Sequence, residues 1–330
     1  MKTVKIKFVG KWKGITPEEN TICHWLKKNG YEVQVTDDAD YIICDVFRDP
    51  PYEYCQYPQI RIFECGENVV PDFNLVDYAI SRYPVTLGDR NFYFPGCTMS
   101  GDYWHALAKK DRNYPEEFLK EKIYFANLVA GHDSEHNYRS MFFEKLSAYK
   151  RVESAGTLLN NMPDGKTVNW LDDSKTNFQR QSKFTICFES TAHEGFFTEK
   201  ITDAFFADTI PIYLGSSNIT EFFNKDAFIN VSDYESFDDV VEKIKELDQD
   251  DEKYLAMLRQ PVLVDPDLPR RLDEELEKYI LHIFEQPIEK AYRRCRVYYP
   301  KWQDEYLARA IEPTFGYKLK QKVKKLLSRD

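Results

Sequence analysis

The sequence predicts an α/β protein made of two consecutive halves, each built around a largely parallel sheet. Short apolar segments recur along the chain, and amphipathic helical segments or short polar loops separate most of them. Strands that alternate with helices pair in parallel, because the helical crossover returns the chain to the same end of the sheet. The length of 330 residues is sufficient for two domains, although one large domain is not excluded.

The first half starts with a strand at residues 3–9, where apolar and basic residues alternate. A helix is expected at residues 17–28, and the Asn29-Gly30 pair is a turn signal that ends it. Further strands are expected at residues 31–35, 41–46, 59–63 and 78–80. The polar and charged stretch at residues 103–121 is predicted to connect the two halves.

The second half repeats the α/β pattern. Residues 183–188 form an almost continuous apolar run, which is typical of a central strand buried on both faces. The remaining expected elements are strands at residues 122–129, 209–214 and 227–231 and helices at residues 137–149, 198–207 and 237–247. The predicted domains are therefore residues 1–117 and 118–288, followed by a basic helical region at residues 289–330.

Charge is distributed unevenly along the chain. The net charge of −10 argues against nucleic acid as a partner of the whole protein. Residues 289–330, in contrast, hold 12 Lys and Arg against 5 Asp and Glu. Within them, residues 317–330 place four apolar side chains on one helical face among many lysines. This tail is expected either to bind an anionic membrane surface or to pack back on the first domain.

The seven cysteines include no CxxC pair, which indicates free thiols in a reducing compartment. Residues 1–9 are short, alternating and lysine-bearing, unlike a signal peptide. No apolar run approaches the roughly 20 residues that span a bilayer. The expected location is cytoplasmic, with peripheral contact to the inner face of the membrane through the tail.

The loop at residues 189–197 follows the predicted central strand, where ligands bind in parallel sheets. Thr198 suits the N-cap of the next helix, which places Glu199 and Lys200 in its first turn. A phosphate there would meet both the helix N-terminus and Lys200, while Glu199 would accept hydrogen bonds from hydroxyls. The pattern suits a nucleotide-sugar, but on this pattern alone the preferred explanation is the ordinary one, an acidic residue that favours the helix dipole beside a solvated lysine.

Three sequence segments carry a family resemblance: FTICFEST at residues 184–191, GFFTEKI at residues 195–201 and PIYLG at residues 211–215. Together they closely resemble the donor-binding motif of the α-1,3/α-1,4-fucosyltransferases, glycosyltransferase family 10. Gly66-Glu67-Asn68 resembles an acceptor-domain signature of the bacterial members, and residues 137–140 (NYRS) resemble their arginine-bearing segment.

The resemblance implies a GT-B fold, in which two Rossmann-like domains face a cleft and the last helix returns to the first domain. It also implies transfer of fucose from GDP-fucose, with inversion, to a glycan hydroxyl such as GlcNAc O3 of an N-acetyllactosamine chain, giving a Lewis-type product. Glu67 matches the general base, and Glu64 is its rival. The implied donor-binding residues are Arg139, Glu189, Ser190, Phe196, Glu199, Lys200 and Asn160.

Two positions depart from the family pattern. Ser190 stands where the family usually has asparagine, and Phe196 stands where it usually has tyrosine. No cofactor and no protein-bound metal are expected, because the Asp-x-Asp spellings at residues 38–40 and 265–267 lie in the wrong context for a metal-diphosphate site. Two alternatives stay open: a GT-B enzyme that uses another nucleotide-sugar, and a catalytically silent protein that binds glycan or nucleotide.

Overall fold

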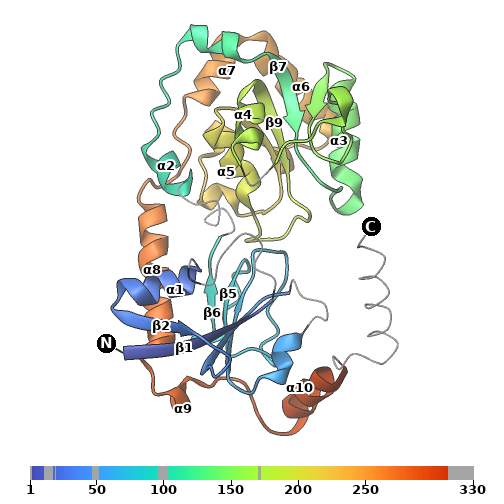
Figure 1. Ribbon diagram of the computed structural model, residues 1–330. Helices are drawn as coiled ribbons and strands as arrows, with labels where there is room; N and C mark the ends of the chain where they lie inside the picture. Colours follow the sequence, from blue (N-terminus) through green and yellow to red (C-terminus); the bar gives the residue numbers. More distant parts are fainter. Residues whose placement is uncertain are drawn as a thin grey trace. The chain divides into compact units, whose positions relative to one another are not determined.

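The computed structural model describes residues 2–10, 18, 20–46, 52–95, 103–169 and 172–310 (Figure 1). The chain divides into two compact units. Unit 1 comprises residues 1–81, 85–93 and 274–330, and unit 2 comprises residues 82–84 and 94–273. These divisions differ from the expected boundaries after residues 117 and 288.

Unit 1 contains a six-stranded parallel sheet with the order β2-β1-β3-β4-β5-β6. Every residue of β3 and β4 is buried, whereas most of the edge strand β2 is exposed or half-buried. The apolar runs therefore form the centre of the sheet, as expected for strands covered on both faces. The strands are β1 (Lys2–Val9), β2 (Tyr31–Val35), β3 (Tyr41–Cys44), β4 (Ile60–Glu64), β5 (Tyr78–Ser81) and β6 (Asn91–Tyr93).

The first helix, α1 (Thr21–Lys28), begins later than residue 17 because Asn20 caps it. The Asn20 side chain accepts a hydrogen bond of 2.9 Å from the backbone N–H of Ile22. The remaining helices of this unit are η2 (Glu53–Gln56), α9 (Ile288–Ala291), α10 (Tyr298–Ala310) and most of α8 (Leu268–Glu285).

The C-terminal helices return to the first sheet, as the resemblance implied. Tyr279 on α8 donates to the carbonyl oxygen of Ala79 on β5 (3.2 Å), and its ring stacks on Phe92 of β6. Lys2 at the start of β1 donates to the carbonyl oxygen of Phe284 (2.9 Å). The tail at residues 317–330 lies outside the described residues.

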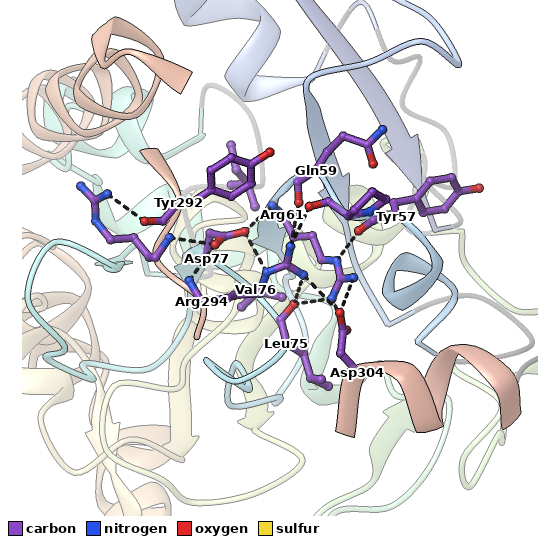
Figure 2. Close-up of polar contacts among 12 residues, drawn as sticks. Tyr57, Gln59, Arg61, Leu75, Val76, Asp77, Tyr292, Arg294 and Asp304 are labelled. Atoms are coloured by element: carbon purple, nitrogen blue, oxygen red, sulfur yellow. Dashed lines mark hydrogen bonds and ion pairs between the residues drawn. The ribbon is translucent and has the colours of Figure 1, made fainter. Parts of the chain in front are cut away.

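A buried arginine joins α10 to the centre of this sheet (Figure 2). Arg61 of β4 is fully buried, and its guanidinium donates to both carboxylate oxygens of Asp304 on α10, at 2.5 and 3.0 Å. The same guanidinium donates to the carbonyl oxygens of Tyr57, Leu75 and Cys55 at 2.9–3.0 Å. A buried charge requires such compensation, so α10 is fixed in place by a residue far from it in sequence.

Asp77 forms a second buried centre beside Arg61. Its carboxylate accepts from the backbone N–H groups of Arg61, Arg293 and Arg294 at 2.8–2.9 Å. It also pairs with the Nε of Arg294 at 3.1 Å, and both side chains are almost completely buried. Figure 2 shows how this carboxylate ties the segment after α9 to β4.

Unit 2 contains a five-stranded parallel sheet with the order β11-β10-β9-β7-β8. The predicted central strand is confirmed, since β9 pairs with β10 on one side and β7 on the other. Its apolar residues join a core that includes Phe142, Ile212 and Val240. The strands are β7 (Tyr124–Leu128), β8 (Val152–Ser154), β9 (Ser182–Phe188), β10 (Ile210–Leu214) and β11 (Ile229–Asn230).

The stretch expected to connect the halves instead packs on unit 2. It forms α2 (Tyr103–Lys109) and η4 (Glu116–Glu121), and the ring of Tyr103 stacks on Phe206 with centroids 4.0 Å apart. The other helices of this unit are η5 (Glu135–Asn137), α3 (Tyr138–Ser147), η6 (Pro163–Gly165), α4 (Ser174–Arg180), α5 (Glu199–Phe206), η7 (Ile219–Glu221), η8 (Lys225–Ala227), η9 (Val231–Asp233), α6 (Phe237–Gln249) and α7 (Asp251–Leu258).

The cysteine side chains that the structure describes are free thiols. Cys23, Cys44, Cys55 and Cys187 are buried free thiols, and Cys295 is an exposed one. Burial raises the pKa of Cys23 to about 11, so this thiol stays protonated near neutral pH.

Among the helices that the structure describes, none combines the length and the apolar character needed to cross a bilayer.

We expect Asp77→Ala to destabilise unit 1 by roughly 3–5 kcal/mol, because it leaves Arg294 buried without its partner and unpairs three N–H groups. Hydrogen exchange should accelerate in β4 and β5 and stay unchanged in β9 and β10. Asp38→Ala removes an exposed ion pair with Lys5 and serves as the control. Equal exchange rates in the two variants would show that the Asp77 network does not hold the sheet.

Candidate functional site

The carboxyl edge of the second sheet gathers the loops that follow its central strands. Phe188 at the end of β9 pairs with Leu214 of β10, and Leu128 of β7 pairs with Ile186. The loops after β7, β9 and β10 therefore leave the sheet at the same edge. Ligands of open parallel sheets bind at this edge.

Glu189, the first residue after β9, is the buried centre of this edge. Its side chain has no exposed surface. One carboxylate oxygen accepts the backbone N–H of Thr198 at 2.7 Å, and the other pairs with Nζ of Lys200 at 3.0 Å. The Thr198 hydroxyl lies 2.9–3.0 Å from both oxygens. Glu189 thus holds the loop to the start of α5.

Two glycines permit this close packing. A side chain at Gly215 would place its Cβ 2.7 Å from Cγ of Glu189 and would also clash with the hydroxyl of Tyr213. Gly195 has a φ of +81°, which other residues adopt only with strain, and its N–H donates to Oγ of Ser216 at 2.7 Å. Both glycines belong to the recognised motif, and each has a structural reason.

Thr198 lies at the N-cap position of α5, but its side chain does not cap the helix as expected. The hydroxyl is instead placed between Glu189 and Lys200, and Nζ of Lys200 donates to it at 2.8 Å. The buried carboxylate of Glu189 takes over part of the capping role by accepting the Thr198 N–H.

Glu199 and Lys200 are the accessible charges of this site. Their side chains are 44% and 25% exposed, and Nζ of Lys200 lies 3.9 Å from Oε1 of Glu199. Desolvation raises the pKa of Glu199, but Lys200 and Lys175 outweigh it and lower that pKa to about 2. Glu199 is therefore ionised across the physiological range and presents an acceptor beside an ammonium group.

Arg139 occupies the first turn of α3 and is 3% exposed. Its guanidinium donates to the carbonyl oxygen of Phe188 through Nε and Nη2, at 3.0 and 2.7 Å, and to that of His132 through Nη1 at 2.7 Å. These bonds use three of the five N–H donors of the side chain. Arg139 therefore fixes the carboxyl ends of β9 and the loop after β7 to each other.

The other predicted donor residues are placed differently. Phe196 is 2% exposed, so its ring belongs to the interior. Ser190 is half-buried, and its carbonyl oxygen accepts the N–H of Glu135 at 2.8 Å. Asn160 bonds within its own loop after β8, where its amide donates to the carbonyl oxygens of Gly156 and Lys166. The structure thus joins Glu189, Glu199 and Lys200 directly and places Asn160 after an edge strand.

Glu67 lies in unit 1, in the turn that follows β4. Its side chain is exposed, and its backbone N–H donates to Sγ of Cys65 at 3.4 Å. The rival carboxylate, Glu64, is the last residue of β4, is 8% exposed and accepts from the Asn20 amide at 2.9 Å. Accessibility favours Glu67 over Glu64 as a base for an external hydroxyl.

A pocket of about 460 Å³ elsewhere in unit 2 is unsuited to a diphosphate. Its lining includes Glu116, Glu117, Asp251 and Glu252 with a single lysine, Lys120, so its charge repels anions. In the part of the chain that the structure describes, no three His, Cys, Asp or Glu side chains are grouped like metal ligands.

The sequence analysis did not identify Lys175 and Asp203, two buried residues next to Glu199. Lys175 on α4 is 9% exposed, and its Nζ lies 2.6 Å from Asp203 and 3.9 Å from Glu199. Asp203 is four residues after Glu199 on α5, beside the apolar positions that cover the sheet. The sequence did contain one signal: an acidic residue such as Asp203 beside the buried face of a helix usually has a buried partner of opposite charge.

Two family models match this chain, one in each half. The family model described as glycosyltransferase family 10 (fucosyltransferase) C-term matches residues 119–259. The model described as the alpha-(1,3)-fucosyltransferase FucT N-terminal domain matches residues 6–99. The two models together cover most of the chain.

Curated relatives include the alpha-(1,3)-fucosyltransferase FucT of Helicobacter pylori, which is 28% identical over 289 residues, 76% of this chain. The human 4-galactosyl-N-acetylglucosaminide 3-alpha-L-fucosyltransferase FUT6 is 32% identical over 124 residues, 37% of this chain. The matches span 58% of the bacterial relative and 32% of the human one. The chain thus covers little more than half the length of the bacterial protein.

Solved structures show the same fold. A crystal structure of an alpha1,3-fucosyltransferase superposes with a TM-score of 0.71 at 24% identity and covers 90% of this chain and 93% of its own. The structure of such an enzyme with GDP-fucose gives a TM-score of 0.65 at 24% identity, with 85% and 91% covered. The fold is that of the GT-B glycosyltransferases, with two Rossmann-like α/β units. With matches to the models of both family domains, the chain belongs to the fucosyltransferases of glycosyltransferase family 10.

Proposed function

We propose that this protein transfers fucose from GDP-fucose to a hydroxyl of a glycan. The observation that carries the proposal is the partly exposed Glu199–Lys200 pair in the first turn of α5, at the carboxyl edge of the second sheet. An ammonium group at a helix N-terminus suits a diphosphate, and a carboxylate beside it suits sugar hydroxyls. A solved relative with this fold was crystallised with GDP-fucose, which supports the same choice of donor.

The proposed reaction is a single displacement with inversion. The acceptor oxygen attacks the anomeric carbon of fucose, and the bond from that carbon to the phosphate oxygen breaks with its electron pair on GDP. Glu67 takes the proton of the acceptor hydroxyl as general base. Lys200 and the N-terminus of α5 stabilise the negative charge that develops on the departing diphosphate.

The remaining donor residues support this arrangement. Glu189 holds Lys200, and Arg139 holds the carbonyl group of Phe188, the residue of β9 that precedes Glu189. Arg139 acts as a second cation for the diphosphate through its remaining N–H donors. Ser190 provides a polar contact, and Asn160 is a loop residue near the same edge. Because these cations balance the diphosphate, the proposal includes no protein-bound metal.

The proposed acceptor is an N-acetyllactosamine-type chain with transfer to GlcNAc O3. The names of the bacterial FucT and the human FUT6 relatives describe 3-linked transfer, and a further human relative, 3-galactosyl-N-acetylglucosaminide 4-alpha-L-fucosyltransferase FUT3, is named for 4-linked transfer. The alternatives are a GT-B enzyme with another nucleotide-sugar and a silent binding protein.

Calorimetry with GDP, UDP and CMP tests the donor first. We expect GDP to bind and the other two nucleotides to bind at least about tenfold more weakly, a difference of about 1.4 kcal/mol. Incubation with GDP-fucose and a glycan array, with the product linkage determined by NMR, then tests the reaction. Preference for another nucleotide would contradict the choice of donor, and GDP binding without any product would favour the silent protein.

Glu67→Ala and Lys200→Ala should separate catalysis from donor binding. We expect Glu67→Ala to lower kcat by roughly 10²- to 10⁴-fold, the usual contribution of a general base, with GDP-fucose affinity nearly unchanged. Lys200→Ala should weaken GDP-fucose binding by roughly tenfold or more, because it removes a charged hydrogen bond. Full activity of the first variant, or unchanged donor affinity of the second, would remove the assigned role.

We also propose that the C-terminal region contacts an anionic membrane surface. Tyr298, Tyr299, Trp302 and Tyr306 of α10 are 63–78% exposed and recur at helical spacing along one face. Exposed Trp and Tyr side chains are typical of the membrane interface. The sequence after Ala310 adds lysines suited to anionic lipid headgroups.

Flotation with vesicles tests this contact. We expect the full chain to bind vesicles that contain an anionic lipid, to bind neutral vesicles weakly and to be released by high salt. Replacing Tyr298, Trp302 and Tyr306 together with serine should weaken binding several-fold. Ile123→Ser, which removes a 65% exposed apolar side chain in unit 2, is the control. Equal binding by both variants would exclude α10 from the contact.

A further inference from the structure

Lys175 lies outside the recognised motif, on the short helix α4 that packs against α5. Its side chain is 9% exposed, and its Nζ lies 2.6 Å from the carboxylate of Asp203, which is equally buried. The same Nζ lies 3.9 Å from Oε1 of Glu199. One buried ammonium group thus faces two carboxylates of α5, of which only Glu199 reaches the surface.

We propose that Lys175 is a positioning residue, which fixes the charged carboxylate of Glu199 so that it accepts hydrogen bonds from hydroxyls of the nucleotide-sugar. The inference deepens the proposed function and depends on it for the identity of the ligand. Lys175 itself is too buried to meet the donor, so it acts only through Glu199.

The geometry of the two lysines supports this role. Nζ of Lys175 and Nζ of Lys200 both lie 3.9 Å from the same oxygen, Oε1 of Glu199. The two ammonium groups therefore hold that oxygen from the protein side. The Glu199 side chain is nevertheless 44% exposed, so part of the carboxylate is accessible from outside. A carboxylate that is already held in place accepts hydrogen bonds from a ligand with less loss of rotamer freedom.

The charges alternate along this network from one end to the other. Glu189 pairs with Lys200 at 3.0 Å, both lysines face Glu199, and Lys175 pairs with Asp203. Asp203 keeps Lys175 in place, because a buried ammonium needs a partner at hydrogen-bond distance. Without Lys175, Asp203 and Glu199 would face each other as like charges on successive turns of α5.

The surroundings of Glu199 determine the sign of the pH effect. The charged groups that interact with it are Lys175 on α4, Lys200 and Asp203 on α5 and Arg139 on α3, and the Thr198 side chain adds a hydrogen bond. Removing Lys175 deletes one of the two lysines that lower the pKa of Glu199 and leaves the carboxylate of Asp203. The pKa of Glu199 should then rise, so that a proton occupies the acceptor at weakly acidic pH.

A purely structural role for Lys175 makes a different prediction. If it only joins α4 to α5 through Asp203, its loss lowers stability and leaves the titration of Glu199 unchanged. Lys183 provides a matched control, because it is 13% exposed and pairs with buried Asp248 at 3.2 Å on the opposite end of β9. Lys183→Met removes a comparable buried pair away from the site.

The experiment measures GDP-fucose affinity by calorimetry at pH 5.0 and 7.5 in the wild type, Lys175→Met, Lys175→Arg and Lys183→Met. Both phosphates of GDP-fucose are esterified, so the ligand contributes no titration near pH 6. We expect the ratio of the Kd at pH 5.0 to the Kd at pH 7.5 to rise in Lys175→Met only, since loss of one of the two lysines raises the pKa of Glu199 and favours protonation of the acceptor at the lower pH. Lys175→Arg should restore the wild-type ratio. Lys175→Gln, which keeps a donor for Asp203, replaces the methionine variant if that variant does not fold.

A second measurement is independent of the donor. With ¹³C-labelled glutamate, the carboxyl signal of Glu199, assigned through Glu199→Gln, is titrated by NMR. We expect its pKa to rise in Lys175→Met and to stay low in Lys183→Met. An unchanged pKa overturns the inference whether or not the donor binds, and so does an unchanged Kd ratio in a variant that binds GDP-fucose. Failure of the wild type to bind GDP-fucose overturns the proposed function instead.

Discussion

The carboxylate of Glu189 is the constraint on which the carboxyl edge of the second sheet depends. A fully buried carboxylate is tolerated only with complete hydrogen bonding, and here the partners are Thr198 and Lys200. These bonds fix the loop between β9 and α5 and require Gly215, since any Cβ there would meet Glu189. Glu189 therefore determines where α5 begins and where its first-turn charges lie. Glu189 is itself buried, and it positions the partly exposed side chains in the first turn of α5.

The site follows from this support as an alternation of charge. Buried Glu189 and Asp203 hold Lys200 and Lys175, and the two lysines hold Glu199 at the surface. Such a network keeps an ammonium group and a carboxylate ionised together, although isolated charges in this environment would favour their neutral forms. A diphosphate and a hydroxyl-rich sugar need these two kinds of group. The two charged groups are thus held in place without a ligand, which would lower the entropy cost of binding the proposed donor.

Local patterns predicted most of the sheet, and tertiary contacts explain the failures. The apolar run of β9 identified the centre of the second sheet, because burial on both faces leaves few alternatives, and the runs of β4 and β10 identified two further strands. The sequence also identified Glu199 and Lys200, which are adjacent in the motif. It missed Lys175, whose helix is short and whose partners lie 24 and 28 residues away. It likewise missed α2, because residues 103–121 are mostly polar. Their few aromatic residues, which pack on unit 2, do not stand out as an apolar helix face.

The two departures from the family pattern have different consequences in this fold. Phe196 is buried, and a phenol hydroxyl at this depth would require a partner, so phenylalanine is consistent with the interior without an unpaired polar group. The absence of the tyrosine hydroxyl at this position therefore costs no stability. Contacts with the proposed donor at this edge fall to the more exposed side chains. Ser190 is half-buried next to Glu189, and its carbonyl already bonds the N–H of Glu135. A serine there leaves more open space than asparagine above a rigid backbone. Of the two positions, Ser190 is therefore the one at which the departure from the family pattern changes the partly exposed surface of this edge.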